Sequence, residues 1–553
     1  MELIMIYRYK FICFFTFLIF SFKISAQEVL LSDNERFYDF LALQGIVERP
    51  YLNFRTLSDS IWIIDKDVIH PWTSLNLGKK RVLNNDIFMR IYDTELFTSY
   101  NSSIPYGQND GALWQGKGIN SSITGGVRFE GYGIEFTFKP QISFSQNLNF
   151  NYITPAYVSN SDYDFSNKAD RFGDYGVKYI DAPQRFGDEP FFIYDWGDSE
   201  IRYVWKTITI GFGTESIWLG PARINPIIHS NNAPTYPKLD LGVRKQPVTI
   251  PKLNWYIGDI EARAWWGYLS ESEYFDNDTS NDHNLITGFS FSYAPSSLLK
   301  GLTIGINRIM LTKWDEFDFT GIFDLLNPLM QSSSTGYDER DQRASMVFSY
   351  LFPSVGFELY FEWARNDGTG SGIYGLIRNP FHTQAFTLGG RKNIIFNSAF
   401  QGELLVEITN LESTREYEFA YPTTFYAHHI ITQGHTNRGQ WIGSGSGSGG
   451  NSQYLGFTLF YKKGYSALFI QREGINNDYL WFRKFDEPLS EKFEEDYNFK
   501  AFLSFGINNY LNIYSHFGLF SSIVYTEIIN PTYDHHNKYD MNFRASIGVK
   551  YIF

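Results

Sequence analysis

Residues 541–553 read MNFRASIGVKYIF, and they decide the fold class. Apolar residues occupy every second position, and only Ile552 breaks the order: Met541, Phe543, Ala545, Ile547, Val549, Tyr551 and Phe553. This period of two predicts a β-strand with one apolar and one polar face. A strand this long needs a partner on each side, and its apolar face needs lipid. We therefore predict an all-β fold, a transmembrane antiparallel outer-membrane β-barrel whose last strand pairs with its first.

The composition agrees with a barrel. Aromatic residues make up 18% of the 553 residues, which is more than one hydrophobic core needs. Abundant aromatics without long apolar runs are typical of barrel strands with aromatic girdles at the membrane interfaces.

The one sustained apolar run lies at residues 11–22, after Arg8 and Lys10 and before Ala26. This arrangement predicts a cleaved signal peptide over residues 1–26, too short to span a bilayer. The single cysteine, Cys13, lies inside this segment, so the chain from Gln27 has no thiol for a disulfide, a metal site or a nucleophile. The formal net charge of −13 argues against nucleic acid as a partner.

A short helix is predicted after the signal. Ser32 to Glu35 form a capping box, and Gly45 is a C-terminal stop signal. Residues up to about Tyr100 show no clean period of two. We predict that residues 27–100 form a small, partly helical periplasmic element or plug, and that residues 101–553 form the barrel.

Alternation dominates from about Gly125. Strands are predicted at 134–139, 201–212, 287–293, 302–309, 355–363, 455–461, 465–471 and 501–507. Short turns, such as Pro353–Ser354, Asn508–Asn509 and 462–464, alternate with long polar loops, as in barrels whose short turns face the periplasm. The length predicts on the order of 16 to 20 strands, with both termini in the periplasm.

Three motifs suggest chemistry that their context does not favour. The glycines of 443–450 match a nucleotide-binding fingerprint, but a strand follows where a helix is required, so we expect a flexible loop or constriction segment. The acidic stretch 276–282 lacks the central Gly and closing Glu of a calcium loop, and we interpret it as a solvated loop. His428, His429 and His435 do not share one face of a strand. We predict no metal, no cofactor and no enzymatic activity, since no GxSxG elbow is present.

Several strings resemble one family. They are Trp218–Leu219–Gly220–Pro221, Ser230–Asn231–Asn232–Ala233–Pro234, Trp265–Trp266–Gly267, 361–367 (FEWARND), 40–47 (FLALQGIV) and 435–439 (HTNRG). Together they resemble the Wzi family of outer-membrane capsule assembly proteins, and the Asn- and Tyr-rich loops resemble those of its Bacteroidetes members. The resemblance implies about 18 strands and a helical periplasmic element. It also implies a non-catalytic protein that binds surface polysaccharide for capsule assembly, with the export machinery as a further partner.

The candidate site residues come from these strings. They are Trp218, Asn231, Asn232, Glu362 and Arg365, which either bind polysaccharide or belong to a polar network that stiffens the lumen. Alternation places Glu358, Tyr360 and Glu362 on the lumen face, and Arg365 at the outer rim. The expected partners are polysaccharide and outer-membrane lipid. A porin or solute channel is the alternative function, and an outer-membrane enzyme is a third possibility.

Overall fold

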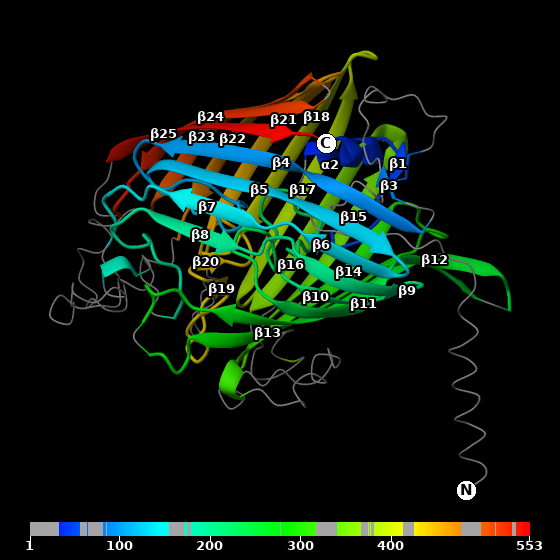
Figure 1. Cartoon of the computed structure of the whole chain (residues 1–553), viewed down its shortest axis with the longest axis horizontal. Helices are drawn as coiled ribbons and strands as arrows, with labels where there is room; N and C mark the ends of the chain where they lie inside the picture. Colours follow the sequence, from blue (N-terminus) through cyan, green and yellow to red (C-terminus); the bar gives the residue numbers. More distant parts are fainter. Residues whose placement is uncertain are drawn as a thin grey trace, which may run out of the picture.

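The structure is a computed structural model of the whole chain. It describes residues 33–55, 63–64, 81–83, 86–153, 171–173, 179–250, 252–276, 278–316, 340–366, 374, 377, 381–412, 425–476, 499–514, 516–533 and 538–552. Its main feature is a closed antiparallel β-barrel (Figure 1). In the described residues, no helix is long and apolar enough to cross a membrane.

The barrel wall consists of long neighbouring strands. The first part of the wall is β4 (Ile87–Asn101), β5 (Gly118–Gly131), β6 (Ile134–Phe138), β7 (Gln141–Ser145), β8 (Phe191–Asp195), β9 (Glu200–Trp205), β10 (Ile208–Gly213), β11 (Lys238–Ile250) and β12 (Trp255–Ser270). The second part is β13 (His283–Ala294), β14 (Leu302–Lys313), β15 (Arg340–Phe352), β16 (Phe357–Asn366), β17 (Gln384–Ile395), β18 (Phe400–Asn410), β21 (Asn451–Tyr461), β22 (Gly464–Gly474), β23 (Ala501–Tyr514), β24 (Phe517–Ile529) and β25 (Tyr539–Tyr551).

Two pairs of these elements are interrupted single strands. β6 and β7 together form one wall strand, and both pair with β5. β8 and β9 together form the next wall strand, in which β9 pairs with β6 and β8 pairs with β7. The described wall therefore has 18 strands, and the predicted fold class is confirmed. The two-residue β3 (Arg81–Val82) pairs with the start of β4. Two small sheets lie apart from the wall: one pairs β1 (Val47–Glu48) with β2 (Ile63–Ile64), and the other pairs β19 (Thr436–Asn437) with β20 (Gln440–Trp441).

The terminal stretch closes the barrel as predicted. β25 pairs with β24 along its whole length and with β4 from Arg544↔Asn101 to Tyr551↔Thr94. The first wall strand begins at Ile87, so the predicted boundary at residue 101 is wrong. A β-bulge between Tyr92 and Glu95 shifts the register of β4, and this shift hides the period of two in the sequence.

The wall has its apolar face outside. On β9, Ile201, Tyr203 and Trp205 are each at least half exposed, while Glu200 and Arg202 are buried toward the lumen. This inverted arrangement is that of a barrel surrounded by lipid. Short turns lie at one end of the barrel and long links at the other, as expected, although two turns differ from the prediction. Residues 201–212 form the hairpin β9–β10 rather than one strand, and Asn508–Asn509 lie inside β23.

The N-terminal helix lies at the short-turn end. Helix α2 (Asp33–Leu43) ends before Gly45, whose positive φ of 74° is the predicted C-terminal stop. Its apolar side chains pack with Phe460, Tyr465 and Tyr510 of the wall, and Gln44 donates a hydrogen bond to Gln401 at 2.8 Å. The helix therefore lies against the lumen face of β21 to β23.

Candidate functional site

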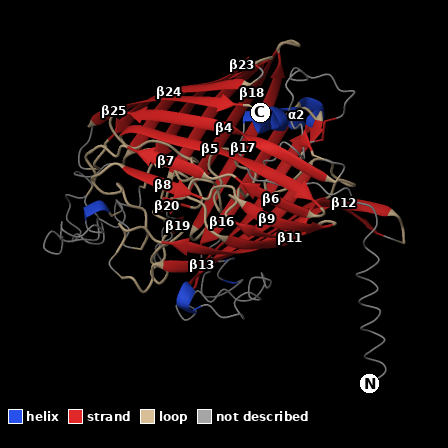
Figure 2. Cartoon of the chain, in the orientation of Figure 1, coloured by secondary structure: helices blue, strands red, loops and turns tan. Residues whose placement is uncertain are grey.

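Long links from the other end fold back into the lumen, and Figure 2 shows such loop segments within the ring of strands. The links 214–237 and 425–450 bury Ile217, Trp218, Ile227, Tyr426 and Ile442 in one hydrophobic cluster. Inward-facing wall residues complete this cluster: Trp265, Leu269, Ile286, Ile309, Leu311, Ala364 and Ala385. An apolar core thus fills the middle of the barrel.

Trp218 is a member of this core. Its indole Nε1 donates to the carbonyl of Ala222 at 3.1 Å, and the guanidinium of Arg55 lies 5.0 Å from its ring. The backbone N–H of Arg55 donates to the carbonyl of Trp218 at 3.0 Å. Trp218 therefore joins the N-terminal segment to the lumen link 214–237.

Two glutamates of the wall hold the inner segments by their backbones. Glu261 accepts hydrogen bonds from the N–H groups of three successive residues, 52 to 54, at 2.8 to 3.1 Å. Glu407 accepts from residues 223 to 225 at 2.7 to 3.1 Å and from the hydroxyl of Tyr360 at 2.6 Å. Each carboxylate satisfies backbone donors that would otherwise be buried without a partner.

Glu362 has a similar position. It points into the lumen, as predicted, and accepts the N–H of Ile227 at 3.3 Å. A Cβ at Gly220, whose φ is +88°, would lie 3.0 Å from Glu362 Oε2, so this glycine permits the close approach of the link to the wall.

An ion-pair cluster fixes α2 in the lumen. Asp39 pairs with Arg49, Arg223 and Arg391 at 2.8 to 3.0 Å, and Arg49 pairs with Glu358 at 2.5 Å. Burial alone raises the pKa of Asp39, but these guanidinium groups outweigh burial and hold that pKa well below its usual range. The cluster joins the helix, the link 214–237 and the wall.

Beyond the core, at the long-loop end, lies a cavity of about 470 Å³. Its lining combines aromatic rings, amides and both signs of charge: Tyr106, Trp114, Phe150, Tyr152, Trp441, Gln108, Gln115, Asn149, Asn151, Gln184, Asn232, Gln440, Asn476, Lys117, Lys500, Lys538, Asp110, Glu473 and Asp540. This size and composition suit a polar organic ligand with apolar ring faces.

Asn232 is the predicted site residue that lines this cavity. Its Oδ1 accepts the N–H of Asn109 at 3.1 Å, and its Nδ2 donates to the carbonyl of Trp441 at 3.2 Å. Asn231 lies next to it, and its carbonyl accepts the N–H of Gly111 at 2.8 Å. The pair joins the link 102–117 to the link 425–450 beneath the cavity.

Buried ionisable groups in the cavity lining have shifted pKa values. The ammonium of Lys500 lies 5.3 Å from the Phe502 ring, and burial lowers the pKa of Lys500 to about 8. Burial raises the pKa of Asp110, whose Oδ2 accepts from Gln115 at 2.5 Å. Burial also raises the pKa of Tyr106 to about 12, so its hydroxyl stays a neutral donor to Ser504.

The glycine-rich segment 443–450 forms part of the cavity floor. Ser444 Oγ donates to Asn225 Oδ1 at 2.9 Å, and the N–H of Ser444 donates to the Tyr426 hydroxyl at 2.8 Å. Gly447, with φ of +74°, leaves room beside Trp441, where a Cβ would lie 3.2 Å from the indole. The segment is therefore buried inside the barrel, where Ser444, Ser446 and Ser448 are almost inaccessible.

Arg365 lies on the other side of the wall. Its neighbour Ala364 is buried in the lumen core, so Arg365 faces outward, opposite to Glu362. Its Nε donates to the carbonyl of His382 at 3.2 Å. The structure therefore does not bring the five predicted site residues together in one place.

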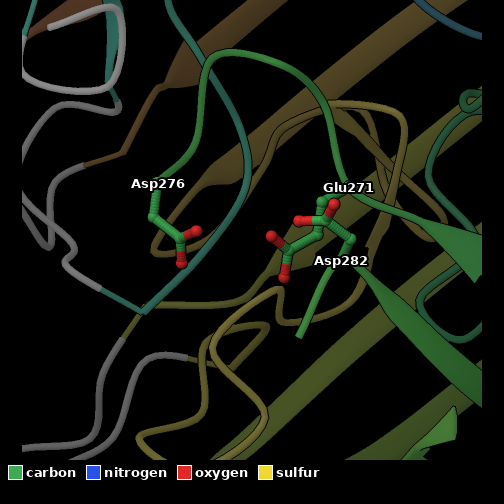
Figure 3. A group of neighbouring side chains, drawn as sticks. All are labelled: Glu271, Asp276 and Asp282. Carbon is green, nitrogen blue, oxygen red and sulfur yellow. The ribbon is translucent and has the colours of Figure 1, made fainter. Parts of the chain in front are cut away.

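The acidic stretch is more compact than expected. Figure 3 shows Glu271, Asp276 and Asp282 on the β12–β13 loop. One carboxylate oxygen of each residue lies within 4.8 Å of one oxygen of each of the other two. Burial and the neighbouring Asp181 and Asp276 raise the pKa of Glu271 to about 10. Burial raises the pKa of Asp181 to about 7. Protons neutralise part of this cluster at neutral pH.

The histidines serve as structural hydrogen-bonding groups. His435 Nε2 lies 2.8 Å from the carbonyl of Ile228, and burial lowers its pKa well below the usual range. His428 Nδ1 accepts the N–H of Ile431 at 3.1 Å. Neither residue lies in a strand, in contrast to the geometry assumed from the sequence.

The sequence did not indicate Trp114, Trp441 or Lys500, which lie on non-repetitive links. The available signal was an aromatic residue close to an amide residue and a Gly in a stretch without alternation, as in Trp114–Gln115–Gly116.

These features define a class: an outer-membrane β-barrel with a filled lumen and a ligand-sized cavity at its loop end. Residues 133–495 match the sequence profile of the family described as capsule assembly protein Wzi. The chain belongs to this family.

A solved structure of one Wzi protein supports the fold, and two further barrels align with lower scores. Wzi of Escherichia coli, described as an outer membrane protein involved in group 1 capsule assembly and a carbohydrate-binding β-barrel, aligns with a TM-score of 0.54 at 13% identity, over 84% of this chain and 85% of that one. OccAB4 of Acinetobacter baumannii aligns at 0.38 with 8% identity, over 85% and 98%. OprD of Pseudomonas aeruginosa aligns at 0.36 with 7% identity, over 83% and 92%. No curated protein matches the chain in sequence.

Proposed function

We propose that this protein binds surface polysaccharide in the loop-end cavity and thereby assists the assembly or attachment of a capsule. The observation that carries the proposal is the cavity itself, in which Trp114, Trp441 and Tyr106 meet amides and charged groups. Aromatic faces stack on the apolar faces of sugar rings, while amides bind hydroxyl groups. Family membership and the carbohydrate binding described for Escherichia coli Wzi support this assignment.

The role is non-enzymatic in this proposal, because recognition and retention of a chain need no bond to break. Of the predicted site residues, Asn232 contacts the ligand, and Asn231 supports it. Trp218 and Glu362 act indirectly, since they hold the lumen links that carry the cavity wall. Arg365 lies on the outer wall and does not contact the sugar.

The remaining assignments concern the periplasmic end. Residues 1–26 are removed as a signal peptide after Ala26, and the segment that contains α2 is the plug of the barrel. The short-turn end faces the periplasm, where the export machinery would make contact. The porin alternative has less support, since the lumen core and α2 occupy the path that a solute would take.

Two measurements test the proposal on the full-length protein. Retention of the protein on immobilised surface polysaccharide from the producing cells measures binding, and planar-bilayer recordings measure conductance. We expect retention and a closed barrel. Large, steady conductance without retention would contradict the proposal and favour the porin.

A further inference from the structure

A row of outward-facing residues crosses five wall strands, β13 to β17, at one level. The register pairs Phe289 with Arg308, Arg308 with Ala344, Ala344 with Arg365, and Arg365 with Gln384. Ile309 and Ala364 belong to the lumen core, so the adjacent Arg308 and Arg365 face away from it. Among the described residues of this row there are two cations and no carboxylate.

The row directly below is apolar. It consists of Phe291, Ile306, Met346, Trp363 and Phe386, which are register-paired in the same way. Met346 is 59% exposed, as expected for a side chain that contacts lipid. The two arginines thus lie at the upper margin of the lipid-facing band on this wall, where a charge is costly unless it meets a polar partner.

Both guanidinium groups extend toward the loop end. Arg308 Nη2 donates to Gln342 Oε1 at 2.6 Å, and Gln342 lies two residues beyond Ala344 in that direction. Arg365 donates to the carbonyl of His382, two residues beyond Gln384. This is the direction of the lipid headgroups if the long loops face outside the cell.

Ala344 separates the two arginines. Two strand spacings place the Arg308 and Arg365 backbones about 10 Å apart, within reach of one anionic group from both sides. The short side chain of Ala344, which is exposed, leaves space between them. Guanidinium pairs of this kind bind phosphate in bidentate geometry.

We propose that Arg308 and Arg365 form a binding site for a phosphorylated glycolipid headgroup of the outer leaflet. The lipid phosphate lies over Ala344 between the guanidinium groups, and its acyl chains cover the apolar row below. This site is separate from the sugar cavity, since it lies on the opposite face of the wall. It would orient the barrel in the outer leaflet and fix the height of its loops above the lipid.

The chain offers a matched control. Arg472 on β22 also faces outward, because its neighbours Gln471 and Glu473 are buried toward the lumen. Its row contains Gln453, Leu503 and Glu527, so it carries one cation and one carboxylate. Loss of Arg472 removes one outward-facing cation, as each single substitution of Arg308 or Arg365 does, without removing a paired site.

The test uses full-length protein in phosphatidylcholine nanodiscs with lipid A, and native mass spectrometry counts retained lipid A. We expect R308Q/R365Q to weaken lipid A binding roughly 30-fold, with R472Q near wild type. Ala344→Leu fills the space between the arginines and should weaken binding while both charges remain. Dephosphorylated lipid A should bind all variants alike and weakly.

Equal binding of lipid A by wild type and R308Q/R365Q would overturn the proposal, and so would equal binding of phosphorylated and dephosphorylated lipid by wild type. Heat-modifiable migration in gels confirms that each variant is a folded barrel. Retention on polysaccharide should be unchanged in R308Q/R365Q, which separates this site from the proposed function.

Discussion

The carboxylate Oδ2 of Asp39 lies 2.8 Å from Nη1 of Arg223, although 184 residues separate the two in the chain. Asp39 belongs to α2 and Arg223 to a link that starts at the opposite end of the barrel. Arg391 of the wall contacts the same carboxylate at 2.8 Å. Helix α2, the lumen link and the wall therefore share one electrostatic centre, and damage to it should loosen all three.

Asp39→Asn should release α2 from the lumen. The change removes one of the two carboxylates that Arg49, Arg223 and Arg391 share, so that Glu358 alone faces the three guanidinium groups. Breaking a buried pair of this kind costs about 3 to 5 kcal/mol. We expect protease cleavage within residues 33–55 and new conductance steps in planar bilayers. Asp93→Asn is the control, since Asp93 pairs with Lys550 at 3.4 Å outside this cluster. Identical conductance in both variants would contradict the latching role.

The same carboxylate predicts a pH dependence. The pKa of Asp39 in the folded protein is lower than the usual 3.8, so the ion pairs stabilise the docked position of α2 fully above that value. The stabilisation is lost only as the pH falls below about 4 toward the folded pKa. Protease protection of residues 33–55 should therefore be constant from about pH 5 to 8 and decline in strong acid. A loss of protection already near pH 6 would mean that a titratable group other than Asp39 controls the docking of α2.

Glu261→Ala should weaken the attachment of residues 52 to 54 to the barrel wall. It removes the acceptor of the N–H groups of residues 52 to 54, and a buried unsatisfied donor costs about 1 to 3 kcal/mol. Hydrogen exchange at these amides should accelerate by at least about tenfold, while α2 stays docked through Asp39. Glu527→Ala, which faces outward on β24, should leave exchange unchanged.

Trp441→Ala should lower polysaccharide affinity by roughly tenfold, as truncation of a central aromatic side chain does in binding sites. Trp441→Phe should restore most of the binding, because it keeps a stacking face. Trp196→Ala removes an outward tryptophan that is 56% exposed and should not change affinity. Equilibrium binding of purified polysaccharide is the measurement, and unchanged binding by Trp441→Ala would place the ligand elsewhere.

Glu271→Gln should remove a pH dependence of the β12–β13 loop. Folding raises the pKa of Glu271 from 4.5 to about 10, so the folded state holds a proton that the unfolded state has lost. The stability of the loop is therefore greatest at low pH and falls as the pH rises toward 10. Hydrogen exchange in residues 270–283, corrected for intrinsic rates, should increase from about pH 6 to 9 in wild type but not in Glu271→Gln.

Asp278→Asn is the matched control for that experiment. Hydrogen bonds from Ser280 lower the pKa of Asp278, so this residue is already charged at pH 6. Its substitution should leave the pH dependence of wild type in place.

The fold followed from the sequence where the alternation was uninterrupted. Strand β25 and the turn at Pro353–Val355 lie where the pattern indicated. β4 was missed because the bulge after Tyr92 exchanges its faces. The β9–β10 turn was missed because Lys206, at φ of +60°, adopts the left-handed conformation without a Gly or Asn to signal it.

The cavity was less accessible to sequence reasoning. Asn232 was identified through the family resemblance, whereas Trp114 and Trp441 come from links with no periodicity. Their meeting depends on how three long links fold back into one lumen, and no local pattern specifies that arrangement. Arg365 was predicted at a rim where it could reach a sugar, but its side chain faces outward. Successive side chains on a strand alternate between the two faces, so a residue three positions after the lumen-facing Glu362 lies on the outer face.

The seam between β25 and β4 has a consequence for biogenesis. The wall is a closed ring only after β25 has paired with β4, so the ring stays open until β25 has been synthesised. The finished ring leaves no lateral entrance, so after that seam has formed the lumen links and α2 can reach the interior only through the two ends of the barrel. A chain that lacks its last strand should therefore remain an open, unprotected sheet.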